Sequence, residues 1–293
     1  MPTVDESFAY CRRVARSRAR NFYYSFVLLP REQRMAMCAI YAFMRYSDDI
    51  SDEPNPSPAS RRAALARWKT AFEDALQGRY GTDRILPAFH HTVVKYQIPE
   101  QYCFELIAGV GSDLVPQRRR TFDDLYRYCY QVASVVGMTC VHVFGYDSPE
   151  ALRLAEKCGV AFQLTNILRD IPEDARLGRV YLPEEDLERF GLGPQDLMEN
   201  RGGARFRDLM EFEWSRAKRY YEEAAPLLTM VRPESRPALW AMISIYYGIL
   251  RRIRQSDYDV YAKRVKLSDF EKVRIVLQAL KLRFTGGAPP FPA

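Results

Sequence analysis

The amino-acid sequence predicts an all-α protein, and three observations support this fold class. Apolar residues recur at three- and four-residue spacing along nearly the whole chain, which is the period of an amphipathic helix. No clear run of alternating apolar and polar residues, typical of a strand, interrupts that pattern. Glycine and proline gather in short breaks, between which lie roughly nine or ten segments of helix length.

The breaks set the order of the predicted helices. They fall at P-N-P-S-P (54–58), Gly78 to Gly81, Pro87, Pro99, Pro116, Ser148-Pro149, Gly178, G-L-G-P (191–194), Gly202-Gly203 and Pro233 to Pro237. None of them is long enough to act as a domain linker, and no internal repeat is visible. We therefore expect one all-α domain over residues 1–285. The tail G-G-A-P-P-F-P-A, residues 286–293, lacks periodicity, and we expect it to be disordered.

The charge balance is mildly basic, with 43 Lys and Arg against 37 Asp and Glu, a net charge of +6. Basic residues cluster between Arg12 and Arg20 and again from Arg118 to Arg120. No recognised nucleic-acid motif accompanies these clusters, so we expect no nucleic-acid partner. An anionic substrate or an anionic membrane surface explains them equally well.

Cysteine usage and hydropathy indicate the compartment. The six cysteines form no C-x-x-C pair, and no secretory signal begins the chain, so we expect reduced, mostly buried thiols in a cytoplasmic protein. The longest apolar stretch, Ala238 to Leu250, is too short to span a bilayer. The protein is thus expected to be soluble or peripheral on the inner membrane face.

A first acidic cluster lies in Y-A-F-M-R-Y-S-D-D-I-S-D-E, residues 41–53, with carboxylates at Asp48, Asp49 and Asp52. Residues three and four apart share one helix face, so these oxygens point at one place. Arg45 shares that face and would complete a clamp for an anion. Two simpler explanations stay open: a solvated helix end before the proline-rich loop, and a local ion pair of Arg45 with the cluster.

A second cluster lies in Q-L-T-N-I-L-R-D-I-P-E-D, residues 163–174, with Asn166, Asp170 and Asp174 in steps of four. Its neighbours are mainly apolar, and charges in apolar surroundings are costly unless they are compensated. Pro172 should kink the helix or mark a break in it, because proline cannot donate to the helical hydrogen bonds.

Together the two clusters favour a metal–diphosphate site. Like charges at helical spacing repel one another, so a cation is expected between them. Hard oxygen ligands that leave room for water and phosphate suit Mg²⁺, with Mn²⁺ as the alternative. Such a site would neutralise the charge that grows on a diphosphate as it leaves an allylic substrate.

Much of the chain resembles the squalene/phytoene synthase family, whose members join two prenyl diphosphates head to head. The resemblance is carried by S-R-A-R-N-F-Y-Y-S-F (17–26), L-L-P-R-E-Q-R (28–34), the first acidic cluster, Y-C-Y-Q-V-A-S-V-V-G (128–137), the second acidic cluster with G-R-V-Y-L-P (178–183), I-Y-Y-G-I-L-R-R-I (245–253) and Y-A-K-R-V (261–265). It implies an isoprenoid-synthase helical bundle around a central cavity, with the two acidic clusters at its mouth.

The resemblance also assigns roles to residues. The implied metal ligands are Asp48, Asp52, Asn166, Asp170 and Asp174, with Asp49 and Glu173 as supporting charges. The implied diphosphate-binding residues are Arg20, Arg45 and Arg264, and Gln163 is placed with them at the substrate. Tyr128 and Tyr246 match polar aromatics near the reacting centre, and we predict them to be catalytic. For either tyrosine the simpler explanation is a core aromatic whose hydroxyl has a partner.

Small and aromatic residues are implied to line the cavity. Ala133, Ser134 and Gly137 would let a prenyl chain lie along their helix, although ordinary helix–helix packing explains them as well. Phe22, Phe26 and Tyr41 would form the cavity wall, where ring faces stabilise carbocations; as bare aromatics they also suit a simple core.

Two segments indicate the substrate. A-S-V-V-G (133–137) and V-H-V-F-G-Y (141–146) resemble bacterial presqualene diphosphate synthases of the squalene and hopanoid route more than phytoene synthases. We therefore expect two farnesyl diphosphates as substrates and no NADPH in the first half-reaction. The alternatives are a phytoene synthase that uses geranylgeranyl diphosphate, a terpene cyclase and a non-catalytic assembly protein of the family; the oligomeric state is left open.

Overall fold

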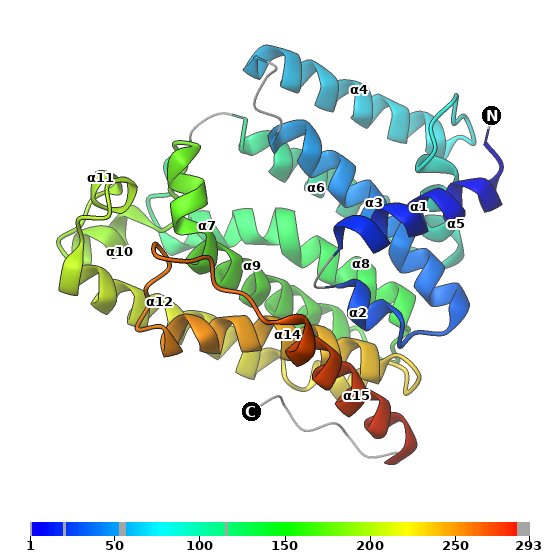
Figure 1. The fold of residues 1–293 in the computed structure, drawn as a ribbon. Coiled ribbons are helices and arrows are strands. Elements are labelled where there is room, and N and C mark those ends of the chain that lie inside the picture. Colours follow the sequence, from blue (N-terminus) through cyan, green and yellow to red (C-terminus); the bar gives the residue numbers. More distant parts are fainter. Residues whose placement is uncertain (1, 20–21, 53–56, 115–116, 286–293) are drawn as a thin grey trace.

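A computed structural model describes residues 2–19, 22–52, 57–114 and 117–285 of the chain. Three sequence predictions fall outside the described residues or their side chains: Arg20, the side chain of Asp52, and the tail at 286–293. Within the described ranges the chain is helical and contains no strand; one isolated bridge joins Tyr146 to Val231. The all-α prediction is confirmed (Figure 1). That residues 1–285 form one domain stays a prediction.

The helices are, in chain order, α1 (Val4–Arg18), α2 (Tyr23–Phe26), α3 (Arg31–Asp52), α4 (Pro58–Leu76), α5 (Leu86–Lys95), α6 (Glu100–Ser112), α7 (Phe122–Cys129), the π-helical η1 (Tyr130–Ser134), α8 (Val135–Phe144), α9 (Glu150–Arg176), α10 (Glu184–Arg189), α11 (Pro194–Met198), α12 (Gly203–Ala224), α13 (Leu227–Met230), α14 (Arg236–Gln255) and α15 (Asp269–Thr285). Helix α7 runs through η1 into α8 without a loop.

Local sequence signals explain where several helices begin. Thr3 and Glu6 form a capping box at the start of α1, in which each side chain satisfies a backbone N–H of the other residue. Thr121 and Asp124 do the same for α7. Helices α4, α5 and α14 carry proline in their first turn, where the missing N–H removes no hydrogen bond.

The break that one proline predicts is absent. Helix α9 continues through Pro172 to Arg176, although proline leaves the carbonyl of Leu168 without its usual donor. Pro172 is buried, and α9 packs along α12, α8 and α14. Of the two outcomes expected at Pro172, the break is therefore wrong, and the kink stays a prediction.

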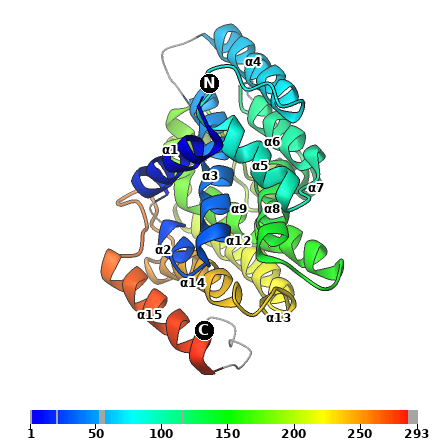
Figure 2. The same ribbon diagram turned by 90° about the vertical axis from the view of Figure 1, so that its right-hand side faces the viewer.

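Two groups of helices are organised around α3 and α9. Helix α3 packs against α1, α4, α5 and α6, whereas α9 packs against α12, α14, η1 and α8. The contacts of α6 with α8 and η1 join the two groups (Figures 1 and 2). The first acidic cluster lies at the C-terminal end of α3 and the second lies on the C-terminal half of α9.

Small residues allow η1 and α8 to approach α9 closely. A Cβ atom placed on Gly159 of α9 would lie 2.5 Å from the Cα of Ser134, and one placed on Gly137 would lie 2.9 Å from the carbonyl oxygen of Ala155. Real Cβ atoms do not come this close to backbone, so both glycines are required by the packing.

All six cysteines are free and buried, as the sequence predicts. Burial raises the pKa of the Cys38 and Cys158 thiols to about 12, so these groups stay protonated. In the part of the chain that the structure describes, no helix has the length and apolar character needed to cross a membrane.

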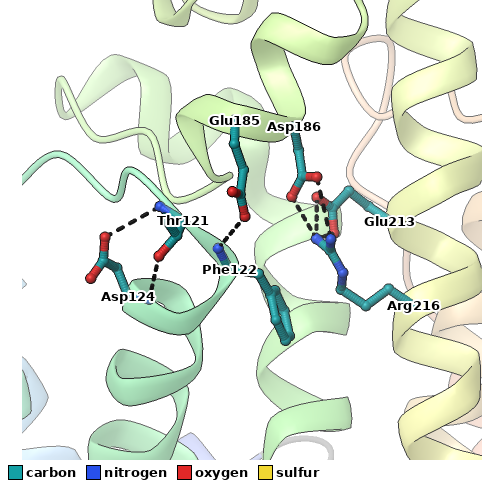
Figure 3. A network of polar contacts seen from close by, with 7 residues as sticks. All are labelled: Thr121, Phe122, Asp124, Glu185, Asp186, Glu213 and Arg216. Atoms are coloured by element: carbon teal, nitrogen blue, oxygen red, sulfur yellow. Dashed lines mark hydrogen bonds and ion pairs between the residues drawn. The ribbon is translucent and has the colours of Figure 1, made fainter.

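A buried ion cluster fixes the segment that follows α9. The Arg216 guanidinium of α12 contacts Asp186 of α10 at 2.7 Å and Glu213 at 2.8 Å, and it lies 4.2 Å from the ring centroid of Phe122 (Figure 3). Nearby, Glu185 accepts a hydrogen bond from the backbone N–H of Phe122 at 2.7 Å. We call Asp186, Glu213 and Arg216 the α12 brace, because they tie the starts of α7 and α10 to α12.

Candidate metal–diphosphate site

The first acidic cluster is held by arginines. Asp49 accepts a hydrogen bond from Arg18 of α1 at 2.9 Å and forms an ion pair with Arg45, one turn earlier on α3, at 2.5 Å. The predicted local ion pair of Arg45 is therefore present. The Nε atom of Arg45, however, is buried and has no hydrogen-bond partner. Arg45 thus keeps a donor that suits an anion such as a phosphate oxygen.

Arg61 of α4 joins the first cluster at the end of α3, and the sequence interpretation missed it. Its Nη1 atom donates to the backbone carbonyl of Ser51 at 2.7 Å, which satisfies a carbonyl in the last turn of the helix. Its Nε atom, like that of Arg45, is buried without a partner. Two guanidinium groups with an unused donor therefore belong to this end of α3.

The second cluster is also bounded by arginines. Asp170 accepts hydrogen bonds from Arg169 (Nε, 2.8 Å) and from Arg264 (Nε, 2.9 Å), a residue in the segment between α14 and α15. The Nε of Arg264 also lies 3.7 Å from a carboxylate oxygen of Glu173. The structure thus places Arg264 at the second cluster.

Unsatisfied oxygens distinguish this cluster. Asn166 donates a weak hydrogen bond to Gln163 at 3.3 Å, but its Oδ1 atom is buried and has no partner. One carboxylate oxygen of Glu173 is also buried without a partner. Such atoms are rare in folded proteins, because leaving them unpaired is costly. Among described residues, the buried side-chain atoms without a partner are Arg45 Nε, Arg61 Nε, His142 Nε2, Asn166 Oδ1 and Glu173 Oε2. Four of these five belong to the acidic clusters or to Arg61 beside the first of them.

Asp174 completes the series on α9. Burial, with the nearby charges of Asp170, Asp113 and Glu173, raises its pKa to about 7, although Arg179 opposes the shift. The carboxyl groups of the metal-free site therefore do not all ionise at neutral pH, and a bound cation would lower the pKa of Asp174.

The donor set fits Mg²⁺ in its chemistry. Unpaired amide and carboxylate oxygens are hard ligands, and unpaired guanidinium donors suit the phosphate that Mg²⁺ brings with it. Within the described ranges, no three His, Cys, Asp or Glu side chains are gathered closely enough to hold a metal by themselves. The metal-ligand roles of Asp48, Asp52, Asn166, Asp170 and Asp174, and the meeting of the two clusters around one diphosphate, stay predictions.

Tyr128 belongs to a buried polar cluster. Its hydroxyl donates to Asp113 at 2.8 Å, and Tyr181 donates to the other oxygen of Asp113 at 3.1 Å. The rings of the two tyrosines stack at 5.0 Å, and the Arg119 guanidinium lies 4.1 Å from the Tyr128 centroid. Burial and Asp113 raise the pKa of Tyr128 well above its usual value. Tyr128 is therefore a fixed, neutral hydrogen-bond donor.

Tyr246 stands in an aromatic stack. Its ring lies between Phe22, at 5.1 Å, and Phe162 of α9, at 4.3 Å and nearly parallel. The structure thus brings Phe22 together with Tyr246, and it adds Phe162. Phe26 is 2% exposed and packs edge-on against Tyr23, so ordinary core packing explains it. These rings form an apolar wall that also includes α2.

The remaining predicted residues divide between packing and the first cluster. Ser134 is fully buried and donates to the carbonyl of Glu156, and Gly137 faces α9, so packing explains the small size of both. Ala133 is half-buried. Tyr41 is half-buried near the charges of Arg45 and Asp48, and burial raises its pKa. The substrate-binding roles of these four residues and of Gln163 stay predictions.

The sequence interpretation missed several site residues. Arg18 and Arg119 were visible only as members of basic clusters, and Tyr181 only as part of G-R-V-Y-L-P. Asp113 and Phe162 carry no local signal, because their partners Tyr128 and Tyr246 are 15 and 84 residues away. Only the folded chain reveals such pairs.

The chain is similar in sequence to known proteins. A family model described as squalene/phytoene synthase matches residues 15–271. The chain is 36% identical to phytoene synthase 1 of Arabidopsis thaliana, over 92% of this chain and 65% of that protein, and 34% identical to 15-cis-phytoene synthase of Synechococcus elongatus, over 93% and 92%. The chain therefore spans about two thirds of the length of the plant relative and nearly all of the bacterial one.

A solved structure is similar as well. The crystal structure of a dehydrosqualene synthase in complex with ligand matches with a TM-score of 0.87 and 29% identity, over 96% of this chain and 98% of that one. The likeness therefore extends over nearly the whole chain.

Proposed function

This chain belongs to the squalene/phytoene synthase family, and on that premise we propose that it condenses two farnesyl diphosphates head to head into presqualene diphosphate. One observation supports this most: buried polar atoms without a partner gather at the two acidic clusters, with donors at the end of α3 and acceptors on α9. Donors for phosphate and oxygens for Mg²⁺ are what a metal–diphosphate complex requires.

The first chemical step is ionisation. The C1–O bond of one farnesyl diphosphate breaks, and both bonding electrons leave with the diphosphate. Arg45 and Arg264 would hold the departing phosphates, and Asp48, Asp52, Asn166, Asp170 and Asp174 would hold Mg²⁺. Bound there, Mg²⁺ would neutralise the charge that grows on the leaving group. Arg45, which pairs with Asp49, would offer its unpartnered Nε to phosphate, and Arg264 would contact phosphate beside its ion pair with Asp170.

The second step joins the substrates. The C2–C3 double bond of the second farnesyl diphosphate attacks the C1 cation, and loss of one proton closes the cyclopropane ring. Tyr128 is a poor acceptor for this proton, because it stays protonated and donates to Asp113. We therefore assign the proton to the released diphosphate. The Phe22–Tyr246–Phe162 stack would exclude water and face the cation with aromatic rings.

A phytoene synthase that condenses two geranylgeranyl diphosphates is the second candidate. The favouring observation is that the two sequence relatives named above are phytoene synthases. The structural neighbour, a dehydrosqualene synthase, is named for a product of the squalene type. The chemistry of the two candidates is the same, and the length of the pocket decides between them. Five further carbons would each favour binding by about 0.8 kcal/mol if they fit, so rejection requires a steric block, for which Phe22, Phe26 and Tyr41 are the candidates.

The test is product analysis with each substrate. Purified protein with Mg²⁺ is incubated with farnesyl or geranylgeranyl diphosphate, with and without NADPH, and products are identified by mass spectrometry. We expect a higher kcat/KM for farnesyl diphosphate and presqualene diphosphate without NADPH. Phytoene as the preferred product would move the assignment to the second candidate. A cyclised product from a single substrate would indicate a terpene cyclase, and absence of turnover with either substrate would indicate an assembly role.

The product is a lipid, and we propose that the protein works in the cytoplasm in peripheral contact with a membrane. The basic stretch near the N-terminus gave the first reason for this contact. A fully soluble enzyme with no affinity for vesicles at low salt would contradict it.

A further inference from the structure

Helix α15 presents an apolar stripe to solvent. Phe270 is 78% exposed, Val273 is 43% exposed and Leu277 is 55% exposed, at positions i, i+3 and i+7 of one helix. The other exposed large apolar residues that the structure describes are scattered over separate elements: Val27, Tyr46, Val94, Leu177 and Met198. Single exposed apolar residues are ordinary, whereas a stripe along one helix face marks an interaction surface.

Cations flank this stripe. The exposed residues of α15 from position 270 to position 281 are Phe270, Val273, Arg274, Leu277, Gln278 and Lys281. This set contains two positive charges and no carboxylate. Of the two acidic residues at the start of the helix, Glu271 pairs with Arg252 at 2.5 Å, and the exposed Asp269, next to Phe270, lies 3.5 Å from the Nζ atom of Lys272. Three apolar side chains flanked by two cations are typical of a helix that lies in the interface of a bilayer.

The position of α15 suits such a contact. The helix lies at the edge of the molecule in both views (Figures 1 and 2). Its inner face packs on α14 and α2, and α14 carries Tyr246 of the aromatic stack. The segment that leads into α15 carries Arg264, which contacts Asp170. The outer face therefore lies behind an aromatic wall of the proposed site.

We infer that Phe270, Val273, Arg274, Leu277 and Lys281, here called the α15 face, dock the protein on an anionic lipid surface. The apolar side chains enter the headgroup region, and the two cations meet lipid phosphates. A second copy of the chain fits this face less well, because a symmetric contact would bring the cations of both copies together. The inference rests on the proposed peripheral contact and locates it on α15 rather than on the N-terminal basic stretch.

Vesicle sedimentation tests the apolar part. The full chain is mixed at low salt with vesicles of equimolar phosphatidylglycerol and phosphatidylcholine, or of phosphatidylcholine alone. We expect preferential binding to the anionic vesicles. A variant with Phe270→Ser, Val273→Ser and Leu277→Ser should lose roughly tenfold or more in partition, since these side chains supply the buried apolar area. The matched control is Val94→Ser on α5, 63% exposed, which should bind as the parent protein does.

Charge variants test the electrostatic part. Arg274→Gln with Lys281→Gln should remove most of the preference for anionic vesicles, and the loss should shrink as salt rises. The matched control neutralises two exposed cations of the N-terminal stretch, Arg12→Gln with Arg16→Gln, and should bind normally. If the triple variant does not fold by circular dichroism, Phe270→Ser alone takes its place.

Three outcomes would overturn the inference. The triple variant could bind vesicles as tightly as the parent protein. The N-terminal charge variant could abolish binding instead. Light scattering could show a dimer that the triple variant converts to a monomer, which would make a second copy the occupant of the α15 face. Binding is scored without turnover, and turnover is measured separately with detergent-dispersed substrate. Failure of this inference and failure of the proposed condensation are therefore distinguishable.

Discussion

The molecule contains two clusters of buried charge that differ in one respect. In the α12 brace, Asp186 and Glu213 are 4% and 1% exposed, and both carboxylates contact Arg216 (Figure 3). On α9, Asp170 is likewise paired with arginine, but Asn166 and Glu173 keep buried oxygens without a partner. The brace is satisfied within the chain, whereas the α9 cluster keeps two buried oxygens that are free to bind a ligand.

A shifted pKa does not separate the two clusters. Burial raises the pKa of Glu213 in the brace to about 8 and that of Asp174 on α9 to about 7. The difference lies in hydrogen bonding: unsatisfied atoms occur at the α9 cluster and not in the brace. Unpaired buried oxygens are therefore the better indicator of a ligand site in this protein.

The largest expected effect is on turnover. Asp170→Asn should lower kcat by roughly a hundredfold to a thousandfold, because it removes a charge that stabilises the leaving group through the metal. The amide keeps one oxygen for Arg169 but loses the second acceptor and the negative charge, so the folded protein should also lose about 1–3 kcal/mol. Steady-state kinetics and urea unfolding measure both effects.

The choice of Asn over Ala follows from the structure. Asp170→Ala would relieve the repulsion between neighbouring carboxylates, and on this effect alone the variant would be as stable as the parent protein or more stable. The side chain of Arg169 is only 11% exposed and pairs with Asp170, so alanine would leave a buried cation unpaired and destabilise the fold. Near-normal turnover of Asp170→Asn at limiting Mg²⁺ would contradict the metal role.

A change in the α12 brace should affect stability rather than turnover. Arg216→Met leaves the buried carboxyl groups of Asp186 and Glu213 without their cation, so the free energy of unfolding should fall by about 3–5 kcal/mol. The fraction that stays folded should keep its kcat, since the brace does not touch the substrate in this account. Urea unfolding with active-site titration checks both points, and a selective loss of kcat without loss of stability would place Arg216 in the site.

The two clusters should also respond differently to pH and Mg²⁺. Asp174 titrates near 3.8 when unfolded and near 7 when folded, so the unfolded chain releases its proton first. Stability of the metal-free protein should therefore fall as pH rises from about 4 through 7. Glu213, raised from 4.5 to about 8, adds a decline of the same sign at slightly higher pH.

Mg²⁺ should separate these two contributions. The ion binds ionised carboxylates, so its stabilising effect on melting temperature should grow as pH rises through 7. Asp174→Asn should remove the part of the decline that Mg²⁺ reverses, and Glu213→Gln should remove a part on which Mg²⁺ has no effect. A Mg²⁺ effect that is independent of pH in the parent protein would contradict the assignment of Asp174.

The smallest expected effect on folding stability concerns two neighbouring residues of α9. Thr165 is bonded to the Tyr221 hydroxyl at 2.9 Å, whereas the Oδ1 of Asn166 has no partner. Thr165→Val should cost about 1–2 kcal/mol, because it leaves a buried hydroxyl unpaired. Asn166→Leu should change stability by less than about 1 kcal/mol in either direction while turnover is lost. A larger loss of stability for Asn166→Leu would mean that the amide is structural.

The sequence predicted those features that depend on short spacing. The helical period identified the all-α class, steps of four located the α9 cluster, and the family resemblance placed Arg264, which contacts Asp170 in the fold. Long-range features were not predictable. Asp113 meets Tyr128 only because α6 and α7 fold together, and the small size of Ser134 and Gly137 is explained by the approach of α9.

The central claim is that the two acidic clusters form a Mg²⁺-dependent diphosphate site, and calorimetry with inorganic diphosphate tests it most directly. We expect the parent protein and the folded fraction of Arg216→Met to bind diphosphate in the presence of Mg²⁺, with protons released as Asp174 ionises. Asp170→Asn, or removal of Mg²⁺ by chelation, should abolish that binding. Equal diphosphate affinity with and without Mg²⁺, unchanged in Asp170→Asn, would contradict the account.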